Sequence, residues 1–245
     1  MKMSRVKKSY PVLDRQGFTL VELLIAMVIS LIIMGLIYTV YRVYQHQYSN
    51  QSQVVEMQES IRSAMNFMMD DIRMAGYNPP NFSTAGIISA TATSLNFTMD
   101  ISNAAGTATD GDGQISDNEN ITFGFAAGAD ASPADGISDS GAAQFVMTNG
   151  AGASQPIVDD ITAVEFLYTF SDGTTATAPA APYTVADIRS VTIALLARTK
   201  SPDSESVNGM TYPRPSGLPD WGPFTDNYRR RLLTTTVKCR NMGLL

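Results

Sequence analysis

Residues 16–41 read QGFTLVELLIAMVISLIIMGLIYTVY, and this stretch decides the fold of the chain. Its apolar run begins at Phe18 and continues for roughly 24 residues, which is long enough for a helix to cross a bilayer. The run contains one charged side chain, Glu22, four residues after its start. Because a carboxylate inside a bilayer is unfavourable unless a partner neutralises it, we interpret Glu22 as a functional residue rather than as a tolerated charge near the headgroups.

The residues before this run are basic and polar. Residues 1–17 carry five of the chain's 17 basic side chains and one of its 23 acidic ones, and such positive charge keeps a flank in the cytoplasm. In an ordinary secretory signal a small-residue cleavage site follows the apolar core, whereas here the small residue Gly17 precedes it. Cleavage after Gly17 would remove the leader, keep the hydrophobic helix and create a cationic amine at Phe18.

The segment Gly17-Phe18-Thr19-Leu20-Val21-Glu22 resembles the processing site of the type IV prepilin family, residue for residue. The resemblance implies that a membrane-embedded prepilin peptidase cuts after Gly17 and N-methylates Phe18. It also implies that the Glu22 carboxylate pairs with the N-terminal amine of a neighbouring subunit as a filament assembles. Neither charge would then stay unpaired in an apolar environment.

The charge balance and the cysteine count narrow the class of protein. Removing the leader leaves 12 basic and 22 acidic side chains, a formal charge of −10, which argues against nucleic acid as a partner. The chain has one cysteine, Cys239, so it contains no intrachain disulfide.

Beyond the apolar run the chain is predicted to stay helical from about residue 18 to about residue 75. Apolar residues recur in steps of three and four, which is the spacing of one helix face: Val54, Met57, Ile61, Met65, Met68, Ile72 and Ala75. Gly76, followed by Asn78-Pro79-Pro80, is typical of a helix end. The first half of this helix suits lipid or a filament core, and Gly35 within it would permit either local melting, as in pilins, or close helix packing. The second half needs a domain packed on it.

Residues 62–77, RSAMNFMMDDIRMAGY, resemble the end of the long helix in PilW-type minor pilins. Asp70 and Arg73 lie three residues apart and can pair on the helix surface, and a cation in the last turn suits the helix dipole. Residues 228–241 resemble the closing strand of the same group.

After Pro80 the helical period ends and short β-type runs follow, at 94–99, 120–125, 143–147, 163–170, 188–196 and 233–239. We therefore predict an α+β, pilin-like fold, in which the distal half of one long N-terminal helix packs on an antiparallel β-sheet. The predicted organisation is a cleaved leader (1–17), a transmembrane or filament-core half (18–41), an amphipathic half (42–76) and a β-rich globular domain (77–245). Residues 201–226 are predicted to form a long loop, whose Trp221 either packs the loop down or contacts a neighbouring subunit.

Residues 108–119, ATDGDGQISDNE, resemble a 12-residue EF-hand calcium loop. The candidate ligands are Asp110, Asp112, Gln114 and Glu119. Ala108 replaces the first acidic ligand, and no predicted helices flank the loop. Calcium binding and a solvated turn both stay open as interpretations.

The sequence offers no set of catalytic residues. Its one histidine, His46, lies just beyond the apolar run, and the chain lacks a zinc-type cluster, a P-loop and a dinucleotide-binding glycine pattern. The arginine run 229–231 is interpreted as a solvated edge or as partners for nearby acids rather than as an anion-binding patch. We expect a protein that is not an enzyme.

The resemblance as a whole implies a minor type IV pilin of the PilW type that takes part in assembling or priming a type IV pilus. The implied partners are the prepilin peptidase and N-methyltransferase, the major pilin, other minor pilins and the inner-membrane assembly platform. The implied location is the bacterial inner membrane, with the domain in the periplasm, and then the pilus. Two alternatives stay open: a minor pseudopilin of a type II secretion system (GspJ-like), and a filament-displayed module that binds a surface or calcium.

Overall fold

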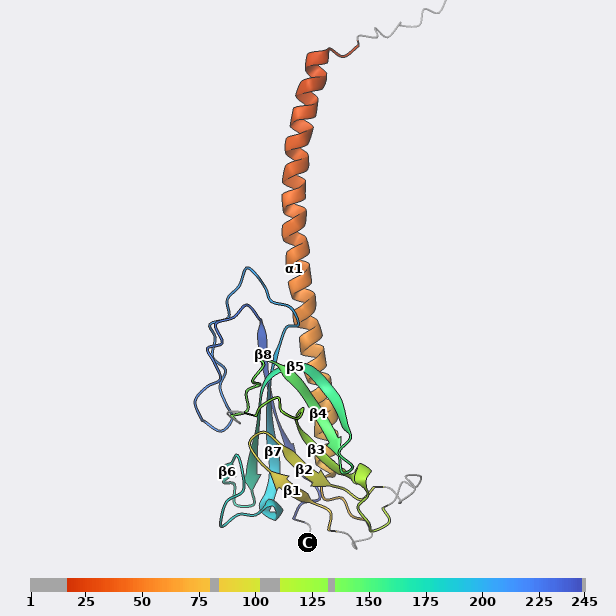
Figure 1. Cartoon of the computed structure of the whole chain (residues 1–245), viewed down its shortest axis with the longest axis vertical. Helices are drawn as coiled ribbons and strands as arrows, with labels where there is room; N and C mark the ends of the chain where they lie inside the picture. Colours follow the sequence, from red (N-terminus) through yellow and green to blue (C-terminus); the bar gives the residue numbers. More distant parts are fainter. Residues whose placement is uncertain (1–16, 80–83, 102–110, 132–134, 244–245) are drawn as a thin grey trace, which may run out of the picture. The chain divides into compact units, whose positions relative to one another are not determined.

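The structure is a computed structural model, and it describes residues 17–79, 84–101, 111–131 and 135–243. It divides into two compact units, Met1–Ser49 and Asn50–Leu245, which are described separately. A single α-helix, α1 (Leu20–Met74), contributes residues to both units (Figure 1). The prediction of one long N-terminal helix ending near residue 75 is therefore confirmed. Residues 1–16 of the predicted leader (1–17) lie outside the described residues, and the four predicted segments stay predictions.

In the second unit the chain forms one eight-stranded sheet in which every pairing is antiparallel. The strands are β1 (Ile87–Ala90), β2 (Leu95–Thr98), β3 (Asn120–Phe125), β4 (Ala143–Asn149), β5 (Ser154–Phe170), β6 (Thr175–Ala176), β7 (Ile188–Arg198) and β8 (Arg230–Lys238). Two short 3-10 turns, η1 (Asp117–Glu119) and η2 (Val185–Asp187), precede β3 and β7. The order is β1-β2-β3-β4-β5-β7-β8, with β6 paired to β5 off this path. The predicted α+β class is thus confirmed.

One face of the sheet is covered by the distal part of α1. The helix buries one stripe, whose members are Met57, Ile61, Ala64, Met65, Met68 and Ile72. These side chains share a core with inward-facing strand residues such as Phe97, Phe123, Phe166 and Ile193. Five of the seven predicted residues belong to this stripe, Val54 is only partly buried, and Ala75 is buried one residue beyond the helix, so the helical period alone located this face.

The helix ends as its sequence indicates. Gly76 adopts φ +78°, a left-handed conformation that favours glycine, and its N–H donates to the Thr98 carbonyl at 2.9 Å. In the last turn Arg73 pairs with Asp70 at 3.0 Å, as predicted. The end of α1 is therefore attached directly to the end of β2.

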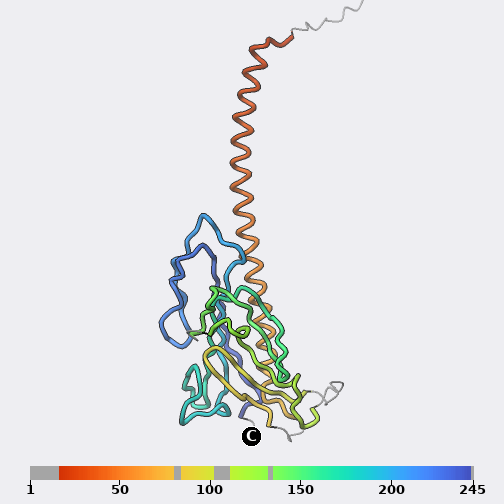
Figure 2. Tube along the Cα trace, viewed as in Figure 1, coloured from red at the N-terminus to blue at the C-terminus, as the bar shows by residue number. Residues whose placement is uncertain are grey.

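The opposite face of the sheet is covered by the long segment between β7 and β8, drawn in blue in Figure 2. Two isolated antiparallel bridges, Asn208 with Asp226 and Tyr212 with Trp221, join its two arms into an irregular hairpin. Trp221 is 1% exposed and packs with Ala163, Ala194 and Leu196 of the sheet. The first of the two interpretations of Trp221 is therefore confirmed, since this side chain holds the loop on the sheet.

Two residues of the arginine run 229–231 form ion pairs with acids of the long segment between β7 and β8. Arg229 pairs with Asp203 at 2.7 Å, and Arg230 pairs with Asp226 at 2.6 Å while its side chain is almost wholly buried. The Arg230 guanidinium lies 4.0 Å from the Phe224 ring centroid. These contacts confirm that two of the three arginines partner nearby acids.

Candidate functional site

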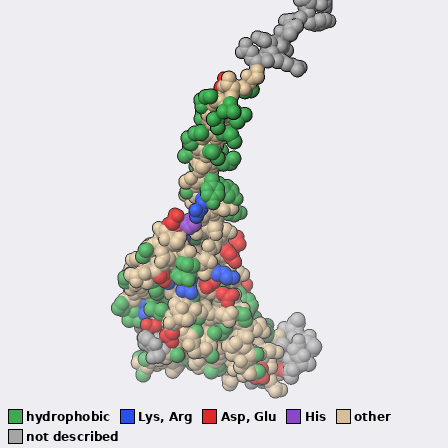
Figure 3. Space-filling view, turned by 45° about the horizontal axis from the view of Figure 1, so that its top comes forward, with side chains coloured by type: hydrophobic (Ala, Val, Ile, Leu, Met, Phe, Trp, Pro, Cys, Tyr) green, Lys and Arg blue, Asp and Glu red, His purple; other side chains and the backbone are tan. Residues whose placement is uncertain are grey.

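The candidate site begins at the start of α1, in the first unit. Its apolar side chains are exposed from Phe18 to Tyr48, and Phe18 itself is 90% exposed. Figure 3 shows hydrophobic side chains gathered around this part of α1. By length and composition α1 contains a segment able to cross a membrane, and none of that segment is buried within the chain. A surface of this kind requires lipid or neighbouring helices to cover it.

Thr19 and Glu22 together form a capping box at the start of this helix. The Leu23 N–H donates to the Thr19 carbonyl at 3.2 Å, which makes Thr19 the N-cap residue. The Glu22 N–H donates to Thr19 Oγ1 at 3.3 Å, and Glu22 Oε2 accepts from both Thr19 N–H and Thr19 Oγ1 at 2.9 Å. Two reciprocal bonds of this type satisfy backbone donors that an isolated helix start would leave open.

The capping box gives Glu22 a second role that the sequence reading did not assign. The signal was present, because Thr19-Leu20-Val21-Glu22 fits the pattern of a threonine followed three residues later by a glutamate. Both observed bonds use Oε2, and among the described residues no bond to Oε1 is seen. The capping box therefore does not use the second carboxylate oxygen of Glu22. Gly17 and Phe18 precede the helix and belong to no regular secondary structure.

The second candidate site, the acidic loop, is described only in part. Asp110 lies outside the described residues, Asp112 and Gln114 are exposed, and Glu119 is 1% exposed. The two Glu119 oxygens accept from the backbone N–H groups of Ile101 and Ser116, each at 2.8 Å. Glu119 therefore holds the loop to the end of β2, and its backbone contacts use both of its oxygens.

Asp100, two residues beyond β2, was not among the predicted residues and anchors the same loop. It is fully buried, and its two oxygens accept from the N–H groups of Asp112 and Gly113 at 3.0 Å. A Cβ on Gly111 would collide with this carboxylate, so the loop needs glycine there. Within the described ranges no three acidic, histidine or cysteine side chains gather to hold a metal ion. Calcium binding stays a prediction.

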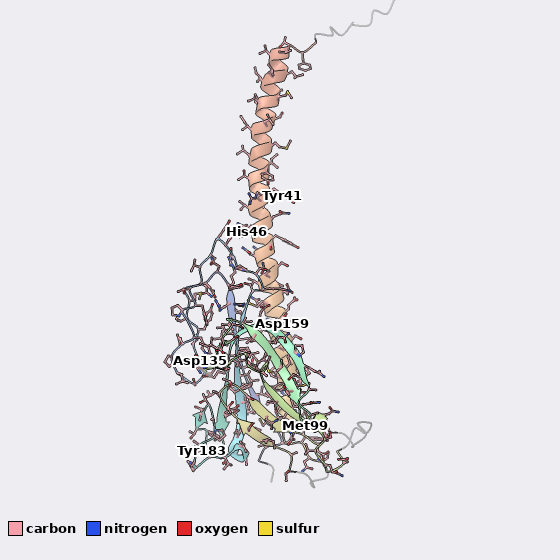
Figure 4. The ribbon with its side chains drawn as sticks, viewed as in Figure 1. Tyr41, His46, Met99, Asp135, Asp159 and Tyr183 are labelled. Carbon is pink, nitrogen blue, oxygen red and sulfur yellow. The ribbon has the colours of Figure 1, made fainter. Side chains whose placement is uncertain are left out.

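The single histidine and the single cysteine belong to different units of the chain. His46, labelled in Figure 4, lies on α1 within the first unit. Cys239 is buried beyond β8, and burial raises the pKa of its thiol to about 12. Since only the thiolate is a nucleophile, Cys239 is an inert packed residue at neutral pH.

Two family models match the chain. The model described as the prokaryotic N-terminal methylation motif matches residues 13–38, and the model described as type IV pilus-assembly protein W matches residues 136–241. No curated protein matches the chain. Among solved structures, a type IV-like pilin from Thermus thermophilus is similar, with 13% identity, a TM-score of 0.46, and coverage of 76% of this chain and 98% of that one. The first match contains the capping box, and the second contains β5, β7, β8 and the loop that packs on them.

Proposed function

We propose that this chain, a minor type IV pilin of the PilW type, acts in pilus assembly by packing its N-terminal helix against those of neighbouring subunits. The N-terminal methylation motif and the PilW match support this function, and the exposed apolar surface of α1 supports the mechanism. The single observation that carries the mechanism is the position of Glu22. It is a carboxylate in the first turn of α1, at the start of a run, residues 18–41, that carries no other charged side chain and is exposed.

Cleavage after Gly17 would place a new amine at Phe18, one residue before the N-cap. The capping box holds the Glu22 carboxylate at the helix start through Oε2 and does not use Oε1. An N-terminal amine from a neighbouring subunit would neutralise this carboxylate at Oε1 without breaking the cap. The ion pair would then fix the axial position of one helix against the next, because an unpaired charge in an apolar environment costs several kcal/mol, on the order of 3.

The wider role follows from the same surface. We infer that the prepilin peptidase processes and methylates the chain, that it is held in the inner membrane with its sheet domain in the periplasm, and that it joins the major and other minor pilins through the assembly platform. Its contribution is structural rather than catalytic. The family matches and the exposed apolar helix support this inference, and it uses none of the scattered acids of the sheet domain.

The test separates the charge of Glu22 from its role as a cap. Glu22→Gln keeps a side chain that serves in a capping box but removes the charge, whereas Thr19→Val removes the cap hydroxyl and keeps the charge. Both variants are produced in the native host, and mass spectrometry first establishes that each mature chain begins at Phe18.

We expect the Glu22→Gln chain to remain in the membrane and to be depleted from purified pili by about tenfold or more. A tenfold depletion corresponds to a loss of about 1.4 kcal/mol in the free energy of incorporation. The Thr19→Val chain should be incorporated nearly as well as the natural one. Normal incorporation of Glu22→Gln would refute the charge role, and if Thr19→Val were lost at the same time, the cap alone would be required.

A further inference from the structure

The last strand of the sheet, β8, has one edge that no described residue pairs. It stands at the end of the strand order and pairs only with β7 (Figure 1). The Cys239 N–H donates to the Arg189 carbonyl at 3.0 Å, and the Thr199 N–H donates to the Arg229 carbonyl at 2.9 Å. Because bonded pairs alternate along an antiparallel ladder, the odd-numbered residues of β8 bond to β7. The even-numbered ones direct their N–H and C=O groups to the free edge.

The two edges of the sheet differ in how they are protected. Natural sheets block their edges with short strands, bulges, prolines or charges. At one end β1 is four residues long and shifts register between Ile87 and Ser89. At the other end β8 is nine residues long, contains no proline and pairs with β7 without a register shift. Its centre, residues 232–237, reads LLTTTV and carries no charge. The β8 edge is therefore an open template for another strand.

The charged residues of β8 and of its immediate flanks in the sequence are all basic. Residues 229–240 contain five basic side chains and no acid, in a chain whose formal charge is −6. Arg229 and Arg230 are occupied by Asp203 and Asp226. Arg231 and Lys238 are exposed near the two ends of the strand, and no ion pair to either is found among the described residues. A complementary partner would carry carboxylates spaced to meet these two cations.

We propose that β8 is a docking edge that takes an extended, acidic segment of another pilin subunit by main-chain pairing. The outward N–H and C=O groups of Leu232, Thr234 and Thr236 would supply the backbone bonds, and Arg231 and Lys238 would select the acidic partner. Pairing of β8 with a second copy of itself would bring like charges together at both ends of the strand, and like charges directly opposite are destabilising. The inference rests on the proposed function, which supplies the neighbouring pilin subunits.

Residue-resolved amide hydrogen exchange on the full-length chain in detergent tests this edge. The chain is measured alone and after mixing with the major pilin and with each other minor pilin of its host. Alone, the amides of Leu232, Thr234 and Thr236 should exchange fast and those of Leu233 and Thr235 slowly. One of the added pilins should slow the fast set by about tenfold or more and leave the slow set unchanged. The proposal is overturned if no added pilin slows the exchange of these amides. It is also overturned if further copies of this chain slow that exchange without any other pilin.

A pair of proline variants gives the matched control. Thr234→Pro removes an N–H that points away from β7, which an edge strand tolerates, and should abolish the added protection while the thermal midpoint stays within a few degrees. Thr235→Pro removes an N–H that bonds to β7 and should lower the midpoint. If Thr234→Pro fails to fold, Arg231→Glu with Lys238→Glu leaves the backbone intact and should also abolish the protection, and full protection in that double variant overturns the proposal. Absence of the natural chain from pili would contradict the proposed function, whereas its presence there without amide protection contradicts only this edge.

Discussion

Asp71 shows how a single side chain couples the helix to pH. It lies on α1, partly buried and next to Asp70, and burial, followed by the charge of Asp70, raises the pKa of its carboxyl to about 6. The ordinary pKa of an aspartate is 3.8, so between pH 3.8 and about 6 the folded chain holds a proton on Asp71 that the unfolded chain has released. Stability is therefore highest below about pH 4 as far as this group is concerned, falls as pH rises to about 6, and stays lower above that.

Replacing Asp71 with asparagine should accordingly stabilise the folded chain at neutral pH. We expect Asp71→Asn to raise the free energy of unfolding by on the order of 1 kcal/mol at pH 7, a value discounted from the full shift because the side chain is partly exposed. The gain should vanish at pH 4. Glu56→Gln, which neutralises an exposed carboxylate of the same helix, is the control and should change stability little at either pH. Thermal unfolding at the two pH values measures this, and an equal gain at both would contradict the assignment.

The residues of the processing site could be read from the sequence because their chemistry is local. The order of Gly17, Phe18 and Glu22 within six positions sets out a cleavage point, a new amine and a carboxylate without any knowledge of the fold. Asp100 and Glu165 could not be found in this way. Each becomes buried only because a segment distant in sequence covers it, residues 112–113 for the first and residues 214–216 for the second.

At the scale of elements, the helix and the centres of six strands were predictable, and the remaining elements were not. The helical period and the alternation of β3 or β7 report their own burial. β1 was missed because its burial pattern, with only its two end residues buried, does not alternate, and β6 is only two residues long. The first half of β5 was also missed. This half contains Pro156, and its pairing shifts register near Ile161, beside Asp160 at φ +59°. These irregularities break the alternation of apolar and polar residues that would have indicated a strand.

Glu165 connects the long loop to β5 and gives this element its own test. Its fully buried carboxylate accepts from Arg214 Nε at 2.8 Å, Ser216 N–H at 3.1 Å and Ser216 Oγ at 2.9 Å. We expect Glu165→Ala to destabilise the folded chain by about 3–5 kcal/mol, because the Arg214 charge is left buried and unpaired. The chain has a single tryptophan, Trp221, in the same loop, so its fluorescence in a urea titration follows the loop directly.

The double variant Glu165→Leu with Arg214→Leu is the control for that change. It removes both charges and should recover most of the lost stability, because apolar residues often replace a buried ion pair at little cost. A single variant as stable as the natural chain, or a double variant as unstable as the single one, would show that the ion pair does not hold the loop.

At the scale of the whole molecule, the two units depend on different surroundings. Every residue of the two hydrophobic clusters belongs to Asn50–Leu245, and the earliest apolar side chain packed against the larger cluster is Val54. The apolar side chains of Met1–Ser49 that the structure describes are exposed. The stability of the sheet domain should therefore be internal to residues 50–245, while the first unit needs lipid or other subunits.

Removing residues 1–49 tests this division. The truncated chain keeps the buried stripe of α1 and the whole sheet, so we expect it to be soluble without detergent. Its thermal midpoint should lie within about 3 °C of the sheet-domain transition of the full chain, which corresponds to a change on the order of 1 kcal/mol at this size. A further truncation of residues 50–60 removes Met57 from the core and should lower the midpoint clearly, which makes it the matched control. If the chain that lacks only residues 1–49 no longer unfolds cooperatively, the first part of the helix belongs to the fold of the sheet domain instead.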